Sequence, residues 1–415
     1  MSDMVEEEAE IVKLPLFTGY GLELEYMIVD KESLNVLPIT DQVFHSVAGA
    51  YLSEINRGEI SWTNEVALHV LELKTTGPVK DLKGCESLFQ DNVRHINTLL
   101  ANFDACFMPT AMHPWMNPFK ELRLWPHSQN VIYETYHKIF NCQGHGWANL
   151  QSAHINLPFA NDEEFSKLHA AIRFLMPLMP ALAASSPIVE EHFTDYLDNR
   201  LNVYMHNQKK VPSITGKVIP ETVFSRSEYE KTILAPMYRD ISVYDTDAVL
   251  QDEWLNSRGA IARFERYTIE IRVLDVQECP QADVAIAKAI CEVLKDLVAE
   301  RYAPLQKLHD FPLERLHAIF LGCVREADQF VIEDAAYLRL FGIQQNRMRA
   351  DEVWQAVLQK HLHNLGELAA PLKHILSKGC LARRIEHACK DRSFAHIKEV
   401  YRELCNCLQQ GRMFG

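Results

Sequence analysis

The sequence lacks the features that would identify a zinc-finger, secreted or membrane protein. Its ten cysteines include no C-x-x-C pair, which argues against a zinc ribbon or a thioredoxin-type redox motif. The first ten residues, MSDMVEEEAE, are acidic and have no apolar core, so they do not resemble a signal peptide. No apolar run has the length of a transmembrane helix. With cysteines expected to be reduced, these absences predict a cytoplasmic protein that binds no membrane.

Two common phosphate-binding motifs are also absent. The chain has no G-x-x-x-x-G-K-[ST] loop and no kinase-type glycine loop. Lys plus Arg number 42 and Asp plus Glu 56, and the formal charge of −14 disfavours nucleic acid as a partner. Any nucleotide must therefore be held by metal ions and arginines.

The arrangement of strand and helix patterns indicates an α+β fold. Hydrophobic residues make up 47% and charged residues 24% of the 415, which is ordinary for a globular protein. Strand patterns are scattered between helix patterns without a βαβ rhythm, which favours an antiparallel sheet. We predict a catalytic domain over residues 14–305 and a C-terminal helical segment over 306–415 packed on it. Residues 1–13 are expected to form a weakly ordered arm, and 187–258 loops over a site. Long helices are expected from their apolar periodicity over 84–103, from Asn161 to about Ala184 and from Gln281 to about Ala303.

The most informative stretch is 21–30, Gly-Leu-Glu-Leu-Glu-Tyr-Met-Ile-Val-Asp. Side chains alternate between the faces of a strand, so Glu23 and Glu25 share one face and the core-forming residues share the other. Like charges this close repel unless a positive group lies between them, and a hard divalent cation is a natural candidate. A half-exposed strand with two solvated glutamates is the alternative, and this stretch alone leaves both open.

Three further strand patterns carry a polar pair on one face and apolar residues on the other. If the four strands share a sheet, their polar faces line one concave surface, with Glu65 contributed by a preceding loop. The pairs are Glu72 and Lys74, His154 and Asn156, and Glu270 and Arg272.

Such a surface is rich in oxygen ligands and contains one imidazole. These ligands suit Mg²⁺ or Mn²⁺ better than zinc or copper, and carboxylate-bound Mg²⁺ usually also holds phosphate oxygens. Several arginines in or near the last strand could bind such phosphates, although each taken singly could also form a surface ion pair. They are Arg258, Arg263, Arg266 and Arg272, with Arg200 as a further candidate.

The order of these segments resembles that of the glutamate–cysteine ligases, in the branch that includes plant enzymes and bacterial carboxylate–amine ligases. Gly21-Leu-Glu-Leu-Glu-Tyr is similar to the opening G-x-E-x-E strand of that family. Further matching segments follow in order over roughly residues 18–300. They are Glu59-Ile-Ser-Trp-Thr-Asn-Glu with Leu71-Glu-Leu, Met112-His-Pro-Trp, Ala153-His-Ile-Asn-Leu, Ala184-Ser-Ser-Pro with Asp198-Asn-Arg200, and Arg263-Phe-Glu-Arg-Tyr-Thr-Ile-Glu-Ile-Arg-Val-Leu-Asp275.

The resemblance implies a glutamine-synthetase-like fold, a curved antiparallel sheet forming a funnel with helices on its convex side. It also implies ATP-dependent joining of a carboxylate to an amine through an acyl phosphate, with Mg²⁺, or Mn²⁺ in its place, as cofactor. The implied metal ligands are Glu23, Glu25, Glu65, Glu72, Glu270 and His154. Catalytic roles fall to Arg272, Glu65 and Arg200, and nucleotide contacts to His154, Asn156, Arg263, Arg266 and Arg258.

Two other functions stay open at this point. A phosphagen-type kinase is thought to share the broad fold, and a catalytically silent relative would act as a binding protein. The partners expected for the ligase are small-molecule substrates, an amino acid carboxylate and an amine. The C-terminal helices could add an oligomerisation surface and make the protein a homo-oligomer.

Overall fold

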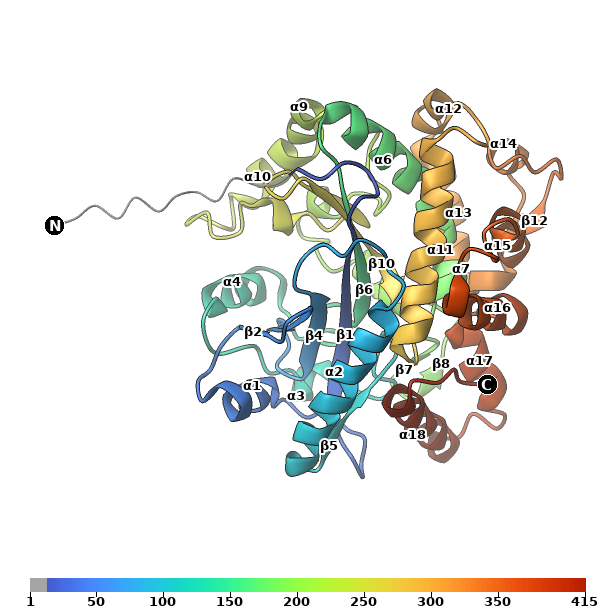
Figure 1. Cartoon of the computed structure of the whole chain (residues 1–415). Helices are drawn as coiled ribbons and strands as arrows, with labels where there is room; N and C mark the ends of the chain where they lie inside the picture. The colour runs from blue at the N-terminus through green and yellow to red at the C-terminus, as the bar shows by residue number, and fades with distance from the viewer. Residues whose placement is uncertain (1–12) are drawn as a thin grey trace.

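The structure, a computed structural model, describes residues 13–415 and is dominated by one antiparallel sheet (Figure 1). All but residue 13 of the predicted N-terminal arm lies outside the described residues. The sheet has eight strands in the order β2-β3-β4-β1-β6-β10-β9, with β5 also paired to β1. The strands are β1 (Gly21–Asp30), β2 (Glu54–Asn56), β3 (Ile60–Asn64), β4 (Val70–Thr75), β5 (Ala105–Met108), β6 (Ser152–Pro158), β9 (Ala260–Arg263) and β10 (Thr268–Asp275). A large antiparallel sheet in an α+β chain is confirmed, whereas the glutamine-synthetase-type funnel stays a prediction.

The four strands with polar pairs are consecutive neighbours in this sheet, as β4-β1-β6-β10. In the register, Glu23 lies opposite Lys74 on one side and His154 on the other. Glu25 lies opposite Glu72. Because opposite residues of paired strands share a face, the register brings these side chains to one polar face, as the sequence predicted.

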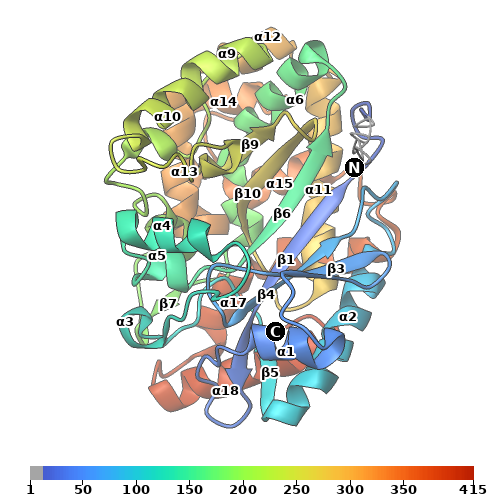
Figure 2. The same ribbon diagram turned by 90° about the vertical axis from the view of Figure 1, so that its left-hand side faces the viewer.

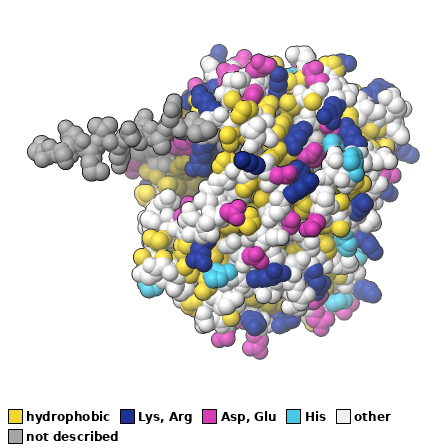
Figure 3. Space-filling view, in the orientation of Figure 1, with side chains coloured by type: hydrophobic (Ala, Val, Ile, Leu, Met, Phe, Trp, Pro, Cys, Tyr) yellow, Lys and Arg dark blue, Asp and Glu magenta, His cyan; other side chains and the backbone are white. Residues whose placement is uncertain are grey.

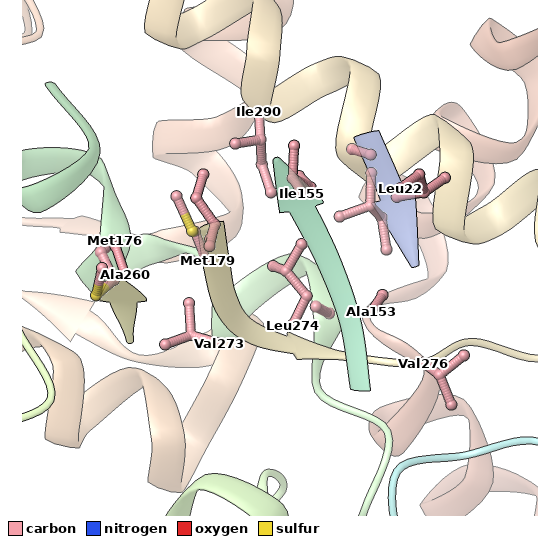
Figure 4. Close-up of a cluster of buried hydrophobic side chains, with 14 of the residues drawn as sticks. Leu22, Ala153, Ile155, Met176, Met179, Ala260, Val273, Leu274, Val276 and Ile290 are labelled. Carbon is pink, nitrogen blue, oxygen red and sulfur yellow. The ribbon is translucent and has the colours of Figure 1, made fainter. Parts of the chain in front are cut away.

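Two long helices cover the other face of the sheet, α2 (Cys85–Leu100) and α11 (Pro280–Val298) (Figure 1). Leu22 of β1 and Ile155 of β6 are buried beneath them. Ile290 of α11 lies over Ile155 in the apolar cluster of Figure 4. Burial of these side chains stabilises the strands and fixes which face stays polar.

The C-terminal helices close one end of the polar face. Met27 and Val29, further along β1, are fully buried in a second apolar cluster with Ile385 of α17 (Leu381–Ala388) and Leu404 of α18 (Phe394–Gln410). In Figure 2, which looks onto the polar side, these helices lie at the lower end of the sheet. The part of the face left open is the part that carries the glutamates.

The remaining C-terminal helices form an outer layer against α11. Its members include α13 (Leu313–Glu326), α15 (Ala350–Leu358) and α16 (Ala369–Lys378). The main apolar cluster runs from Tyr20 to Leu408, so both predicted parts contribute to one core. The boundary between 14–305 and 306–415 stays a prediction.

Three expectations about elements were wrong. The helix expected from Asn161 to about Ala184 is broken into α6 (Asp162–Leu175), a 3-10 turn (Met176–Leu178) and α7 (Pro180–Ala183). Pro177 and Pro180 explain the break, because proline has no N–H to donate within a helix. Three short helices occupy part of the region 187–258, which was expected to form loops. They are α8 (Asn199–Tyr204), α9 (Arg226–Tyr229) and α10 (Ala235–Ile241). The expected all-helical segment contains a small strand pair, β11 (Val331–Ile332) and β12 (Met348–Arg349).

The surface carries charged side chains of both signs, interspersed on the face that Figure 3 shows. All ten cysteines are free thiols, and all except Cys106 are buried. Within residues 13–415, no helix combines the length and apolarity needed to cross a membrane.

Candidate active site

His154 lies at the centre of the carboxylates on the polar face. Its Nδ1 is 2.8 Å from Glu23 Oε2 and 3.7 Å from Glu270 Oε1. Its Nε2 is 4.0 Å from Glu25 Oε1. Only Glu23 keeps substantial exposure, with 21% of its side chain accessible, whereas Glu25, Glu72 and Glu270 are buried. Strands β1, β4, β6 and β10 therefore bring together residues predicted from four separate segments.

Two hydroxyl residues that sequence reasoning missed hold these carboxylates in place. Ser152 donates to Glu25 Oε2 from its backbone N–H at 2.7 Å and from its hydroxyl at 3.0 Å, and its Oγ is 2.8 Å from His154 Nε2. Thr63 of β3 donates to Glu72 Oε1 at 2.5 Å. Ser152 lies two residues before His154 on the same strand, so the alternation of side chains was a usable signal. For Thr63 there was none, because β3 had not been recognised as a strand.

Amide and guanidinium groups flank the carboxylates. Asn156 donates to Glu23 Oε1 at 2.9 Å. Arg272 Nε is 2.9 Å from Glu270 Oε1, and Arg263 Nη1 is 3.6 Å from Glu270 Oε2. Glu270 thus has positive charge on both of its oxygens.

Arg200 approaches the site from α8 and is 2% exposed. Its Nη2 donates to the carbonyl oxygen of Arg272 at 2.6 Å, and its Nη1 is 3.5 Å from Asp275 Oδ1. Asp275 Oδ2 accepts from the Ser185 backbone N–H at 2.8 Å and the Ser186 hydroxyl at 2.9 Å. This buried network fixes the end of β10, next to a bulge between residues 271 and 274 that sets the position of Arg272.

The crowding of carboxylates shifts their protonation. Burial and the charges of Glu25 and Glu72 raise the pKa of Glu65 well above its ordinary value of 4.5. Burial and the charges of Glu23 and Glu25 do the same to the pKa of Glu72. Burial also opposes ionisation of Glu23, but hydrogen bonding to His154 and its charge outweigh burial and lower that pKa to about 2. One imidazole therefore offsets only part of the negative charge.

Two cavities open onto this cluster, of about 620 Å³ and about 430 Å³. Both are lined by Glu65, His154 and Arg272, so they meet at the cluster. The first extends past Arg263, the exposed Arg266 and the 75–78 turn after β4. Both volumes fall within the range of small-molecule sites.

One predicted site residue does not join them. Arg258 lines neither cavity, and its guanidinium is bidentate to Glu221, with Nε to Oε2 at 2.6 Å and Nη2 to Oε1 at 2.7 Å. It lies before β9, so it was grouped with the other arginines by sequence proximity alone.

A family model for glutamate–cysteine ligase family 2 matches residues 20–401. The chain belongs to this family. It is 30% identical over 394 residues to an uncharacterized protein of Archaeoglobus fulgidus, covering 95% of this chain and 99% of that protein.

Two solved structures have a similar fold. One is a bifunctional glutathione synthetase from Pasteurella multocida, with a TM-score of 0.57, 14% identity and 94% of this chain covered. This family 2 chain covers 53% of that protein, about half its length. The other is a glutamate–cysteine ligase from Francisella tularensis in complex with AMP, with a TM-score of 0.56 and 12% identity. That match covers 96% of this chain and 90% of the other, and at these identities both show the fold alone.

The residues of this family 2 protein fit a divalent cation. Two groups of three residues each hold ligand atoms within 4.8 Å of one another. They are Glu23 with His154 and Glu270, and Glu25 with Glu72 and His154. A carboxylate-rich set with one imidazole is typical of Mg²⁺ or Mn²⁺. Burial and the neighbouring carboxylates raise the pKa of Glu65 and Glu72, so a cation bound among them would favour the ionised forms of both groups. Glu65 lies outside both groups, at the junction of the cavities.

Sequence reasoning missed the outer wall of the second cavity in this family 2 protein. Tyr133 and Tyr136 come from α4 (Asn130–Phe140), Trp147 from α5 (His145–Ala148) and Trp254 from a 3-10 turn (Glu253–Leu255). Figure 2 shows α4 and α5 on the polar side of the sheet. No signal in the sequence links α4 and α5 to Trp254, which lies far along the chain, and only folding brings these residues together.

Proposed function

We propose that the protein is an ATP-dependent carboxylate–amine ligase that forms an amide bond, with glutamate–cysteine ligase activity as the default reaction. The observation that carries this proposal is the carboxylate cluster around His154 at the junction of two cavities. Membership of glutamate–cysteine ligase family 2 supports it.

We assign the first cavity to ATP. Arg263 and Arg266 there can bind phosphate oxygens without a glycine-rich loop. The Francisella tularensis enzyme of similar fold is in complex with AMP, which supports an adenine nucleotide as the ligand. The second cavity is then left for the acid and the amine.

Glu23, Glu25, Glu72, Glu270 and His154 would hold Mg²⁺, or Mn²⁺ in its place. When bound, the cation neutralises charge between the carboxylate substrate and the phosphates. The protein's own Arg272, which lines both cavities, would add positive charge at the same point. Arg200 would keep the Arg272 backbone fixed through its 2.6 Å hydrogen bond.

The reaction would proceed in two transfers. An oxygen of the substrate carboxylate attacks the γ-phosphorus of ATP, the bond from that phosphorus to the β,γ-bridging oxygen breaks, and ADP leaves. The amine nitrogen then attacks the acyl carbon, the carbon–oxygen bond to phosphate breaks, and inorganic phosphate leaves. Glu65 is our candidate to accept the proton that the amine loses, because it lines both cavities.

A substitution at Glu270 tests the proposal. We expect Glu270→Gln to reduce ADP release in the presence of an acid and an amine by at least about a hundredfold, because the ligand charge next to His154 is lost. The assay uses Mg²⁺–ATP and a panel of amino acids in pairs, with circular dichroism to check folding. Glu163→Gln, at an exposed residue of α6, is the matched control and should keep full activity. Full activity in Glu270→Gln would contradict the metal-site assignment, and a folded wild type that releases no ADP with any pair would favour a silent relative.

A further inference from the structure

The charged side chains of the second cavity are confined to one end. Within the described chain, its charged lining residues are Glu25, Glu65, Arg200 and Arg272, besides His154. Four of these five belong to or line the carboxylate cluster, and Arg200 contacts the backbone of Arg272 at 2.6 Å. The rest of the lining is uncharged. A ligand reaching from the cluster to the outer wall therefore meets charge at its reacting end only.

The outer wall is built from aromatic rings in mutual contact. The ring centroids of Tyr136 and Trp147 are 4.9 Å apart, and those of Tyr136 and Trp254 are 6.0 Å apart. Tyr136 is buried behind the two indoles, whereas Trp147 and Trp254 are partly exposed. Ile132 and Leu150, also partly exposed, extend the same lining. Ring faces held in this way favour a flat apolar group.

This wall is a poor match for a second carboxylate. A dicarboxylic amino acid lying along the cavity would leave one carboxylate against the indoles, and no described residue there offers it a cation. An unpaired charge in such surroundings is strongly disfavoured. A small polar side chain would leave the aromatic surface uncovered.

The charged end suits the backbone groups of an α-amino acid. Glu65 and Glu25 can accept hydrogen bonds from an ammonium group, and Arg272 can pair with a carboxylate. Two buried donors of the lining find no acceptor among the described residues, Tyr204 Oη near Arg200 and, on the aromatic wall, Trp147 Nε1. A ligand with acceptor oxygens would satisfy groups that the protein leaves unpaired.

We propose that the second cavity selects an amino acid with an aromatic side chain, and that this amino acid supplies the amine that is acylated. The proposal rests on the ligase function above and replaces its default acceptor, cysteine, with an aromatic amino acid. The ring packs against Trp147 and Trp254, and the amine lies at the carboxylate cluster.

The first test uses the wild-type protein. Calorimetric titrations with Mg²⁺–ATP present measure binding of phenylalanine, tyrosine, cysteine, glutamate and phenethylamine. We expect the two aromatic amino acids to bind at least about tenfold more tightly than cysteine, the default acceptor. Phenethylamine, which lacks the carboxylate, should bind more weakly than phenylalanine. Equal or tighter binding of cysteine would overturn the proposal, and equal binding of phenethylamine would overturn the amino acid assignment.

Variants of the wall form the second test. Trp254→Ala should weaken phenylalanine binding about tenfold or more, and Trp254→Phe should restore most of it, because an aromatic face is retained. Phe119→Ala, at a 64% exposed aromatic residue outside the cavity lining, is the control and should not change binding. Unchanged binding in Trp254→Ala would contradict the assignment of the wall.

A positive charge placed on the aromatic wall should favour a ligand carboxylate there over an aromatic ring. Ile132→Lys puts an ammonium at a partly exposed position of α4, where its stem can reach solvent. We expect it to tighten glutamate binding relative to phenylalanine, and no change in this ratio would count against the proposal.

Failure of the inference can be told apart from failure of the ligase function. ADP release with cysteine as the preferred amine contradicts only the inference, whereas no ADP release with any pair contradicts the function.

Discussion

His154 and the glutamates around it show what single residues do in this site. One imidazole lies between carboxylates of two strands, β1 and β10, with Glu23, Glu25 and Glu270 within 4.0 Å of its ring nitrogens. Burial, together with the charges of neighbouring glutamates, raises the pKa of Glu65 and Glu72, so these two groups hold their protons more strongly when no cation is bound. Cation binding must then release protons.

The coupling between cation binding and proton release predicts how the stability of the folded protein depends on pH. The ordinary pKa of Glu65 and Glu72 is 4.5 and burial raises it in the folded protein, so the folded state holds protons that the unfolded chain has released. Their contribution to stability is complete below that ordinary value and is lost as pH rises toward the folded pKa. Mg²⁺ should therefore raise the melting temperature more at about pH 8 than at about pH 5.

Thermal unfolding with and without Mg²⁺ at both pH values checks this prediction. Glu72→Gln removes one of the titrating groups and should flatten the pH dependence. A magnesium effect of the same size at both pH values would show that these carboxyls do not bind the cation.

At the same scale, the sequence predicted the carboxylates because charge and alternation are local properties. Ser152 could have been found from its spacing to His154, whereas the outer aromatic wall could not. The contact between Tyr136 and Trp254 depends on how two segments far apart in sequence pack, and no periodic pattern carries that information. Arg258 was misassigned because neighbours in sequence need not share a site, and it pairs with Glu221 instead.

Among the elements, β1 and β6 set the geometry of the cluster. Gly21 lies opposite Asn156 in their register, and a Cβ added at Gly21 would be 2.9 Å from the Cβ of Asn156. The close approach keeps Asn156 within reach of Glu23. The two strands thus position the first glutamate through a small residue on one strand and an amide on the other.

We expect Gly21→Ala to displace Asn156 and lower ADP release by about tenfold, with a smaller loss of stability of about 1 kcal/mol. Gly144→Ala is the matched control, because an added Cβ there meets no atom within 4 Å and its φ is not positive. Steady-state kinetics and denaturant unfolding of both variants give the comparison. Wild-type kinetics in Gly21→Ala would show that this contact does not position the site.

The elements that were predicted correctly are the long and periodic ones, such as β1, β10, α2 and α11. The strands β3, β5 and β9 were missed because each is only four or five residues long and pairs with strands distant in sequence. Their stability comes from the sheet, as tertiary pairing outweighs local propensity in short strands. The bulge in β10 is likewise a property of pairing and has no local signature.

For the whole molecule, one continuous core ties the cluster to the C-terminal helices. The main apolar cluster includes residues from Tyr20 to Leu408, and α17 and α18 pack on Met27 and Val29 at the end of β1 beyond the glutamates. The helices beyond residue 305 therefore help to confine the site, a role that their helical periodicity alone did not predict. Family membership adds the reaction class, and the two cavities add where the reactants would lie.

We propose that the carboxylate cluster binds ATP through a divalent cation. Calorimetric titration of ATP tests this without knowledge of the other substrates. Wild-type protein should bind ATP with Mg²⁺ and lose at least about tenfold in affinity with a chelator. Glu270→Gln should bind weakly under both conditions, and Glu163→Gln should match the wild type. Equal ATP affinity with and without the cation, or in Glu270→Gln and wild type, would contradict the account.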